Sequence, residues 1–253
     1  KSSSELDITK REAINILFAQ EKFEYCINCA AYTAVDKAES DKEMAYLVNS
    51  EAVQYLAQAC KTNSTILVHI STDFVFDGSK TTPYKEEDVP NPINVYGASK
   101  LKGEQWVQSI LEQYFIIRTS WVYSEYGHNF VKTMLRLGTE RNELGVVNDQ
   151  WGSPTYAGDL AEAIMKIINL NATNYGLYHF SNEGSITWYD FAKAIFKNRA
   201  MNLNVNPISS EAYPTPAIRP RFSVLDKNKS TKLLGLIPNN WTNSLYENLK
   251  KTK

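Results

Sequence analysis

The sequence is poor in cysteine and glycine and contains no long apolar run. Its 253 residues include 3 cysteines and 11 glycines, and the formal net charge is −1. An odd, low number of cysteines argues against a disulfide framework and indicates a reducing compartment, the cytoplasm. No apolar run approaches the roughly 18 to 20 residues of a membrane span. The balanced charge gives no sign of binding to nucleic acid or to a membrane surface.

Cys26 and Cys29 form a C-x-x-C pair, but their surroundings predict a strand rather than a metal site. Residues three apart on a strand point to opposite faces of a sheet, so they cannot easily hold one ion. No second pair and no nearby histidine completes a set of four ligands. We therefore expect no metal at these cysteines.

Helix and strand patterns alternate along the chain, which predicts an α/β fold. Strand-type apolar runs occur in YCINCAA, STILVHIST, YFIIRTSWVY and GLYHFS, and amphipathic patterns between them predict helices, one of them running from about Asp36 to Lys61. Such alternation is typical of a mostly parallel, Rossmann-like doubly wound sheet with helices on both faces. After about residue 200 the chain becomes aperiodic and richer in proline, as in segments that fold over a ligand.

The segment INVYGASKLKGE places a tyrosine one helical turn before a lysine. Tyr96 and Lys100 therefore point from the same face of a predicted helix. A cation about 4 Å from a phenol favours phenolate by roughly 4 kcal/mol at an effective dielectric constant of about 20. We expect Lys100 to bring the pKa of Tyr96 towards neutrality, where a general acid or base works best. The spacing alone more often marks surface neighbours, so the surrounding sequence decides.

The ends of the predicted strands carry polar segments that can complete a site. An open parallel sheet binds ligands beyond the carboxyl ends of its strands. The segments NCAAYT, ISTDFVF and RTSWVY lie at such ends, and Thr72 offers a hydroxyl there. We expect these segments to share a cleft with Tyr96 and Lys100.

Seven segments of the chain together resemble one family. In this order and at these spacings, they are similar to the dTDP-4-dehydrorhamnose reductase family of the extended short-chain dehydrogenase/reductase superfamily: NCAAYTAVDKAES, ISTDFVFDG, NVYGASKLKGE, RTSWVY, NFVKTMLRL, VVNDQWGSPT and AYPTPAIRP. The tyrosine–lysine spacing marks only the superfamily, whereas VDKAES, RTSW and NDQWGSPT are more specific. The resemblance covers nearly the whole chain.

The resemblance implies an enzyme that makes a nucleotide sugar for cell-surface polysaccharide. The expected reaction is NAD(P)H-dependent reduction of the 4-keto group of dTDP-4-dehydro-L-rhamnose to dTDP-L-rhamnose, with NADPH or NADH as the cofactor. Residues 1–142 and 156–180 would form the dinucleotide-binding domain. Residues 143–155 and 181–253 would form a smaller C-terminal substrate-binding domain. Some members of the family are magnesium-linked dimers, so the resemblance leaves monomer and homodimer open.

The resemblance also implies roles for individual residues. Tyr96 would protonate the keto oxygen, Lys100 would hold the nicotinamide ribose and tune Tyr96, and Thr72 would hydrogen-bond the keto oxygen. Further cofactor contacts are implied for Asp7, Ala31, Tyr32 and Thr33. Further substrate contacts are implied for Asp73, Trp121, Asn129, Gln150, Trp151 and Arg219.

Some of these residues have a second interpretation. An arginine suits a pyrophosphate because its planar fork makes two parallel bonds, but Arg221 lies close to Arg219, so either can reach it. Asp36 in VDKAES can simply cap a helix. Trp121 and Trp151 can be core aromatics.

Two other functions are compatible with parts of the sequence. Related nucleotide-sugar dehydratases and epimerases form the first alternative, but dehydratases carry T-D-E where this chain has Phe74 after Asp73, which leaves no second carboxylate. The second alternative is a non-catalytic nucleotide-binding subunit, because the beta subunit of methionine adenosyltransferase resembles the same family. The presence of Tyr96, Lys100 and Thr72 favours an enzyme.

One motif of the family does not occur in the sequence. The family opens with a strand and a glycine-rich turn, G-x-x-G-x-x-G, which holds the cofactor pyrophosphate. This sequence has no such motif and no glycine before Gly78. The resemblance therefore implies that a strand and a glycine-rich loop, on the scale of about 30 residues for one βαβ unit, precede Lys1.

Overall fold

Four parallel strands form the central sheet of the protein. The structure, a computed structural model, describes residues 1–2 and 4–252. The strand order is β1 (Tyr25–Asn28), β2 (Ile66–Thr72), β3 (Tyr114–Thr119) and β8 (Gly176–His179), and each neighbouring pair is parallel. The strands coincide with the apolar runs of the sequence. The predicted Rossmann-like α/β fold is confirmed.

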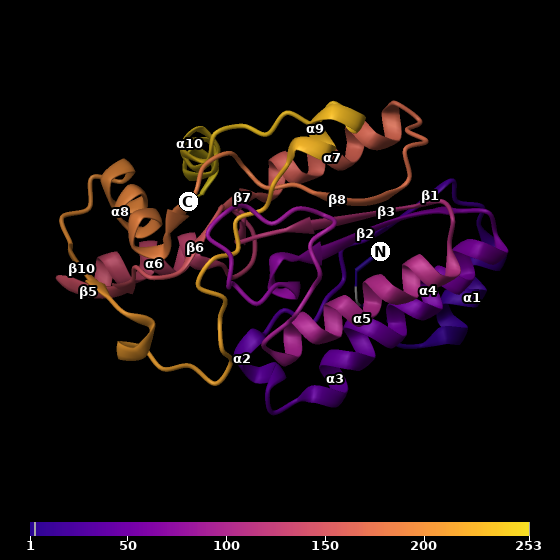
Figure 1. The fold of residues 1–253 in the computed structure, drawn as a ribbon, viewed down its shortest axis with the longest axis horizontal. Coiled ribbons are helices and arrows are strands. Elements are labelled where there is room, and N and C mark those ends of the chain that lie inside the picture. The colour runs from indigo at the N-terminus through magenta and orange to yellow at the C-terminus, as the bar shows by residue number, and fades with distance from the viewer. Residues whose placement is uncertain (3, 253) are drawn as a thin grey trace.

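Helices cover both faces of this sheet. Figure 1 shows α1 (Arg11–Gln20), α4 (Ala52–Thr62) and α5 (Val95–Ile110) on one side, and α7 (Ala157–Asn169) and α9 (Asn228–Leu234) on the other. Consecutive strand residues pack into the cores on opposite faces of the sheet. Leu67 and Ile116 pack with α1, α4 and α5. Val68 and Ile117 pack with α7 and α9. This alternation is the period of two that a strand imposes.

A second unit lies beyond the carboxyl ends of the strands. It contains α6 (Phe130–Glu140), α8 (Trp188–Asn198), α10 (Trp241–Lys251) and the parallel pair β5 (Glu143–Val147) and β10 (Asn204–Ile208). Two small pairs adjoin it: β4 (Val122–Tyr123) with β7 (Thr155–Tyr156), and β6 (Trp151–Gly152) with β9 (Ile186–Thr187). The predicted division into two domains stays a prediction. Helix α6 packs against α8, and α9 packs against β8, so elements on the two sides of the predicted division contact each other.

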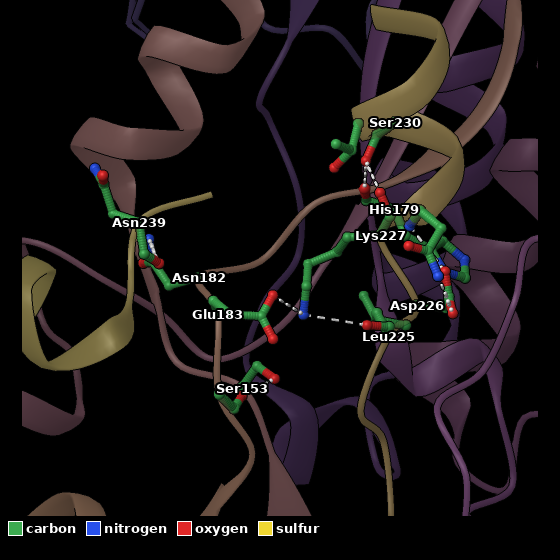
Figure 2. A network of polar contacts seen from close by, with 12 residues as sticks. Ser153, His179, Asn182, Glu183, Leu225, Asp226, Lys227, Ser230 and Asn239 are labelled. Carbon is green, nitrogen blue, oxygen red and sulfur yellow. Dashed lines mark hydrogen bonds and ion pairs between the residues drawn. The ribbon is translucent and has the colours of Figure 1, made fainter. Parts of the chain in front are cut away.

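The C-terminal segment is tied to the end of β8 by polar contacts. Ser230 Oγ donates to the His179 carbonyl oxygen at 2.8 Å, and Lys227 Nζ lies 3.4 Å from the Glu183 carboxylate (Figure 2). Lys227 Nζ also donates to the Leu225 carbonyl at 3.3 Å. These bonds fix the chain that returns from the second unit across the sheet.

The helix predicted from about Asp36 to Lys61 is broken into pieces. The structure has α2 (Val35–Ala38), α3 (Lys42–Tyr46), a π-helical turn (Leu47–Glu51) and then α4. The break lies where Ser40 Oγ bonds the Lys37 carbonyl and Asp41 has a non-helical φ of −124°. Ser and Asp side chains compete with helical backbone bonds in this way, and the periodic pattern alone did not reveal it.

Helix α5 lies unusually close to its neighbours at two glycines. A Cβ on Gly97 would lie 2.0 Å from the Phe74 carbonyl oxygen, and one on Gly103 would lie 2.2 Å from the Asn49 carbonyl oxygen. Asn94 caps the helix, because its Oδ1 accepts from Gly97 N at 2.8 Å. The two glycines therefore allow α5 to approach the 3₁₀ turn Asp73–Val75 and the π-helical turn.

We predict that Gly103→Ala destabilises the protein, although alanine normally favours a helix interior by about 1 kcal/mol over glycine. The added methyl group would meet backbone, so α5 must shift, at a cost of roughly 1–3 kcal/mol in the free energy of unfolding. Gln105→Ala on the exposed side of the same helix is the control and should change stability by less than about 0.5 kcal/mol. Urea denaturation measures both, and a Gly103→Ala protein as stable as the parent would contradict the close approach.

Candidate active site

The three predicted catalytic residues come together where β2 ends and α5 begins. Thr72 is the last residue of β2, and Tyr96 and Lys100 follow each other on α5. Lys100 is 2% exposed and its Nζ donates to the Ile70 carbonyl oxygen at 2.6 Å. A hydrogen bond between the Thr72 hydroxyl and the phenol acts to lower the pKa of Tyr96. Thr72 and Tyr96 therefore lie close to each other, whereas the Lys100 ammonium is directed at β2.

The predicted direction of the Tyr96 pKa is wrong for this structure. Burial is the largest effect and raises the pKa of Tyr96 to about 12, and the nearby Asp73 carboxylate adds to the increase. Lys100 does not offset this because its ammonium is directed at the Ile70 carbonyl. Desolvation favours the neutral form of any buried acid. At neutral pH Tyr96 therefore holds its proton, which is the state a proton donor requires.

Burial also sets the charge of Lys100. It lowers the pKa of Lys100 to about 8, and the charges of Glu104 and Cys29 act in the opposite direction. At neutral pH most Lys100 side chains are therefore still protonated. An ammonium offers three N–H donors, and within the described residues only the Ile70 carbonyl is recorded as an acceptor. The remaining donors can bind an outside hydroxyl or phosphate group.

A buried ion pair between α5 and β3 lies one helical turn beyond Lys100, and it was not predicted from the sequence. Arg118 Nε and Nη2 donate to the two oxygens of Glu104 at 2.9 and 2.7 Å. Ser71 Oγ donates to Glu104 Oε1 at 2.5 Å. Glu104 lies one turn beyond Lys100 on the same face of α5, and both partners of the ion pair are almost fully buried. An arginine inside the apolar strand FIIRTS was the signal, since a buried charge needs a partner.

The backbone of the predicted cofactor loop is fixed by a buried asparagine. Asn49 Oδ1 accepts from Tyr32 N at 2.8 Å, and its Nδ2 donates to the Tyr32 carbonyl at 3.1 Å and to Ser99 Oγ at 3.0 Å. Asn49 is fully buried in the π-helical turn, a feature that is frequent at functional sites. Ala31 and Tyr32 are partly buried in this loop, and Thr33 is exposed. Sequence reasoning named the loop but not Asn49.

Asp7, a predicted cofactor residue, lies in the turn before α1. Its carboxylate accepts from Thr9 N at 3.0 Å and from Thr9 Oγ1 at 2.7 Å, and its side chain is exposed. Its neighbours Leu6 and Ile8 pack against the core of α1 and α4. Within the described residues no hydrogen bond links Asp7 to Lys100 or to the loop of Tyr32.

A cavity of about 970 Å³ lies next to Phe74, the neighbour of Tyr96, although Thr72, Tyr96 and Lys100 are not among its lining residues. Of the predicted substrate residues, Trp121, Gln150 and Arg219 line it. Phe74 also lines it, and its ring lies edge-on to Tyr96 with centroids 5.8 Å apart. The cavity lies between the sheet unit and the second unit, because its lining comes from both. Its size is in the usual range for a small-molecule site.

Trp121 is held in a strained conformation at this cavity. Its φ is +49°, a region that residues with side chains rarely adopt. Its ring stacks on Trp188 with centroids 3.5 Å apart, and a Cβ on Gly152 would lie 2.5 Å from it. These contacts with Trp188 and Gly152 fix the orientation of the Trp121 ring. The interpretation as a purely core aromatic is not favoured, because the ring lines the cavity.

Four of the predicted substrate residues do not line the large cavity: Thr72, Asp73, Asn129 and Trp151. Asn129 caps α6, where its Oδ1 accepts from Lys132 N at 3.2 Å and its Nδ2 donates to the Ser124 carbonyl at 2.6 Å. Trp151 lines a separate cavity of about 480 Å³ together with Lys80 and Arg221. Their substrate roles stay predictions.

Asp73 is a buried acid beside Thr72. It is 2% exposed and accepts from Thr72 Oγ1 at 3.1 Å. Burial is the largest effect and raises the pKa of Asp73 to about 7, although hydrogen bonds from Ser223 and Thr72 oppose it. Within the described residues its Oδ2 has no hydrogen-bond partner. A substrate hydroxyl is one group that can satisfy this oxygen.

The described residues show neither a metal-binding cluster nor a membrane-spanning helix. Among residues 1–2 and 4–252, no cluster of three or more His, Cys, Asp or Glu side chains is placed to hold a metal ion. In the same part of the chain no helix has the length and apolar character needed to cross a membrane. Cys26, Cys29 and Cys60 are free thiols, and Cys29 is exposed directly after β1.

The fold and the site together define a member of the extended short-chain dehydrogenase/reductases. The parallel sheet with helices on both faces provides the frame, and Thr72, Tyr96 and Lys100 are the residues predicted to be catalytic.

Comparison with known proteins identifies the family. A family model described as the RmlD substrate binding domain matches residues 1–253. The dTDP-4-dehydrorhamnose reductase of Aggregatibacter actinomycetemcomitans is 45% identical over 252 residues, 96% of this chain and 86% of the relative. The dTDP-4-keto-6-deoxy-D-glucose reductase of Streptomyces niveus is 38% identical over 246 residues, 96% of this chain and 84% of the relative.

A solved structure gives the same result. The crystal structure of dTDP-4-dehydrorhamnose reductase from Bacillus anthracis in complex with NADP has a TM-score of 0.96 and 43% identity, and the match covers 100% of this chain and 89% of that chain. The chain belongs to the dTDP-4-dehydrorhamnose reductase family, whose model carries the description RmlD substrate binding domain.

We predict that Asp73→Asn flattens the pH dependence of stability. The pKa of Asp73 rises from 3.8 to about 7 on folding. The proton therefore contributes stability fully below pH 3.8, and this contribution is lost as the pH rises through about 7. The loss amounts to at most about 4 kcal/mol. Denaturant unfolding between pH 4 and 8 measures it, and parent and variant curves with the same pH dependence would contradict the raised pKa.

Proposed function

We propose that this protein reduces the 4-keto group of dTDP-4-dehydro-L-rhamnose to dTDP-L-rhamnose with NADPH. One observation carries the proposal: Tyr96 keeps its proton at neutral pH and its ring contacts Phe74, which forms part of the wall of the large cavity. The names of the relatives supply the sugar and the reaction class. Nucleotide-sugar and cell-surface polysaccharide biosynthesis follows as the pathway.

The residues present fit a nicotinamide cofactor. The buried Lys100 ammonium has donors left for the two hydroxyls of a ribose. The loop of Ala31, Tyr32 and Thr33 follows β1 at the carboxyl edge of the sheet, where dinucleotides bind in such folds. The Bacillus anthracis relative carries NADP, which favours NADPH over NADH here. When bound, this cofactor supplies the hydride.

The side chains in and near the cavity have separate roles in the proposed reaction. Tyr96 holds its proton at neutral pH and donates it to the keto oxygen as negative charge develops there. The Thr72 hydroxyl lies close to the phenol and hydrogen-bonds the keto oxygen. Trp121 and Phe74 cover the sugar and exclude water. Asp73 offers its oxygen Oδ2 to a sugar hydroxyl.

A second candidate substrate is favoured by one comparison. The Streptomyces niveus relative is named for dTDP-4-keto-6-deoxy-D-glucose, which is also a dTDP-linked 4-keto sugar. The non-catalytic alternative is less favoured because Tyr96, Lys100 and Thr72 are all in place. We further propose a cytoplasmic enzyme, in keeping with three free cysteines. Monomer and homodimer remain the two expected states, with magnesium implied only by family resemblance.

The reaction is tested directly by following the loss of absorbance of the reduced nicotinamide as NADPH is oxidised. The protein is mixed with NADPH and either dTDP-4-dehydro-L-rhamnose or dTDP-4-keto-6-deoxy-D-glucose. We expect the first sugar to be consumed faster, and the reaction with NADH to be slower. Consumption of only the second sugar would favour the alternative substrate. No consumption of either sugar would favour a nucleotide-binding subunit.

Replacement of Tyr96 by phenylalanine should abolish most turnover. The change removes only the hydroxyl, so the rate should fall by at least about 100-fold, the usual scale for a lost general acid. Binding of dTDP, measured by calorimetry, should persist and serves as the control for folding. Turnover close to that of the parent would exclude Tyr96 as the proton donor.

Cofactor affinity should depend on the charge of Lys100. Its pKa of about 8 predicts that NADPH binding weakens as the pH rises through this value, because the neutral amine is a poorer donor to the ribose. Lys100→Met should bind more weakly at pH 7 and lose this dependence. Fluorescence titration with NADPH measures both proteins, and a variant that retains the transition near pH 8 would assign it to another group.

A further inference from the structure

Arg219 lines the large cavity, but both terminal nitrogens of its guanidinium are hydrogen-bonded to the protein. Its Nη1 and Nη2 donate to the two carboxylate oxygens of Asp36 at 2.9 and 2.7 Å. Nη1 also donates to Thr215 Oγ1 at 2.6 Å and to the Ala217 carbonyl at 3.1 Å. The parallel two-bond geometry is the fork that an arginine otherwise offers to a phosphate. A diphosphate at Arg219 would therefore have to displace Asp36.

Asp36 is equally committed to this contact. Besides Arg219, it accepts from Ala217 N at 3.2 Å. The hydrogen bond from Arg219 is the largest effect on the pKa of Asp36 and lowers it below its usual value. Asp36 does not cap α2, since no side-chain hydrogen bond caps that helix. The family segments VDKAES and AIRP thus meet through one ion pair that joins residues far apart in the sequence.

The ion pair joins two functional parts of the molecule. Asp36 belongs to α2, which directly follows the loop of Ala31, Tyr32 and Thr33. Arg219 belongs to residues 213–223, a segment that we call the strap because it lines the large cavity along most of its length. Figure 1 shows the orange segment after β10 reaching down to α2 before it turns back towards the sheet.

The same strap is also tied to the helix that carries Tyr96. Asn94, the cap of α5, donates through Nδ2 to the Ile218 carbonyl at 2.9 Å. Glu39 Oε1, at the end of α2, accepts from Val95 N at 2.8 Å. The strap, the end of the cofactor loop and the first turn of α5 therefore share one junction. A displacement of any of the three acts on the other two.

Arg221 is exposed and lacks the short ion pair that Arg219 makes with Asp36. Its side chain is 75% exposed, and its nearest carboxylate, Glu211, is 3.9 Å away and itself 86% exposed. Arg221 lines both the large cavity and the adjoining smaller one. Its backbone is fixed, because Trp151 N donates to the Arg221 carbonyl at 2.8 Å. Such a cation on a fixed backbone can turn to an anion without breaking a short two-bond ion pair like that of Arg219 with Asp36.

We propose that Asp36 and Arg219 form a latch that holds the strap over the substrate cavity and couples it to the cofactor loop, and that Arg221 is the cation that meets the diphosphate of the nucleotide sugar. Arg219 and Asp36 are positioning residues in this assignment. The part concerning Arg221 rests on the proposed function. The latch itself is a property of the protein without ligands.

The test compares Asp36→Asn, Arg219→Met, their combination and Arg221→Met. Asp36→Asn is nearly isosteric and keeps Arg219, so it separates the two roles. Arg221→Met is the matched control, since it also removes one positive charge from the strap. Hydrogen–deuterium exchange of residues 213–223 is measured without ligand, and the dissociation constant of dTDP is measured by calorimetry with and without NADP⁺. Thermal melts confirm that each variant is folded.

The latch predicts that Asp36→Asn and Arg219→Met speed exchange in the strap to the same extent. Both should weaken dTDP binding by roughly five- to tenfold and reduce the effect of NADP⁺ on it, as expected for lost coupling between sites. The combination should be no worse than either single change, because the two residues act as one unit. Arg221→Met should weaken dTDP binding while exchange in the strap stays as in the parent.

Two results would overturn the assignment. If Arg219→Met weakens dTDP binding while Asp36→Asn leaves it unchanged, Arg219 is itself the phosphate ligand. If exchange in the strap is the same in the parent and in Asp36→Asn, there is no latch. A parent protein that does not bind dTDP would instead refute the proposed function and the role of Arg221, and the exchange experiment would still decide on the latch.

Discussion

The burial of the Lys100 ammonium is the constraint on which the rest of the site depends. An isolated charge is costly to remove from water, and here the Ile70 carbonyl and the nearby Glu104 carboxylate offset part of that cost. This arrangement requires α5 to lie close against its neighbours. Gly97 and Gly103 make that approach sterically feasible. The local composition of α5 therefore follows from the need to hold one ammonium inside the protein.

The same burial fixes the protonation state of the proton donor. Tyr96 lies in the same poorly solvated region, and burial is the largest effect that raises its pKa, while the Lys100 ammonium is directed at the Ile70 carbonyl. A phenol that keeps its proton at neutral pH suits a reaction in which a carbonyl becomes an alcohol. The Glu104–Arg118 pair balances charge beneath the site, so Lys100 can remain charged next to it. The protonation states of Tyr96 and Lys100 therefore depend on the packing of α5 as well as on the neighbouring side chains.

The sequence predicted the elements whose signal is local and missed those whose partner is distant. Apolar runs located β1, β2, β3 and β8, and the helical pattern placed Tyr96 and Lys100 on one helix, α5. The pKa of Tyr96 was mispredicted because spacing does not reveal that Lys100 turns to the Ile70 carbonyl. Asn49 and Asp36 were missed as structural contacts because their partners, Tyr32 and Arg219, are known only once the chain is folded. Similarly, a helical pattern cannot report the turn at Asp41.

The central claim is that this chain transfers a hydride to a dTDP-linked 4-keto sugar and that Tyr96 supplies the accompanying proton. Transfer of deuterium from NADPH deuterated at the reactive carbon, read by mass spectrometry of the product sugar nucleotide, tests it most directly. The account predicts one deuterium in dTDP-L-rhamnose formed by the parent protein, and little labelled product with Tyr96→Phe. A product formed without deuterium, or equal labelling by both proteins, would contradict it.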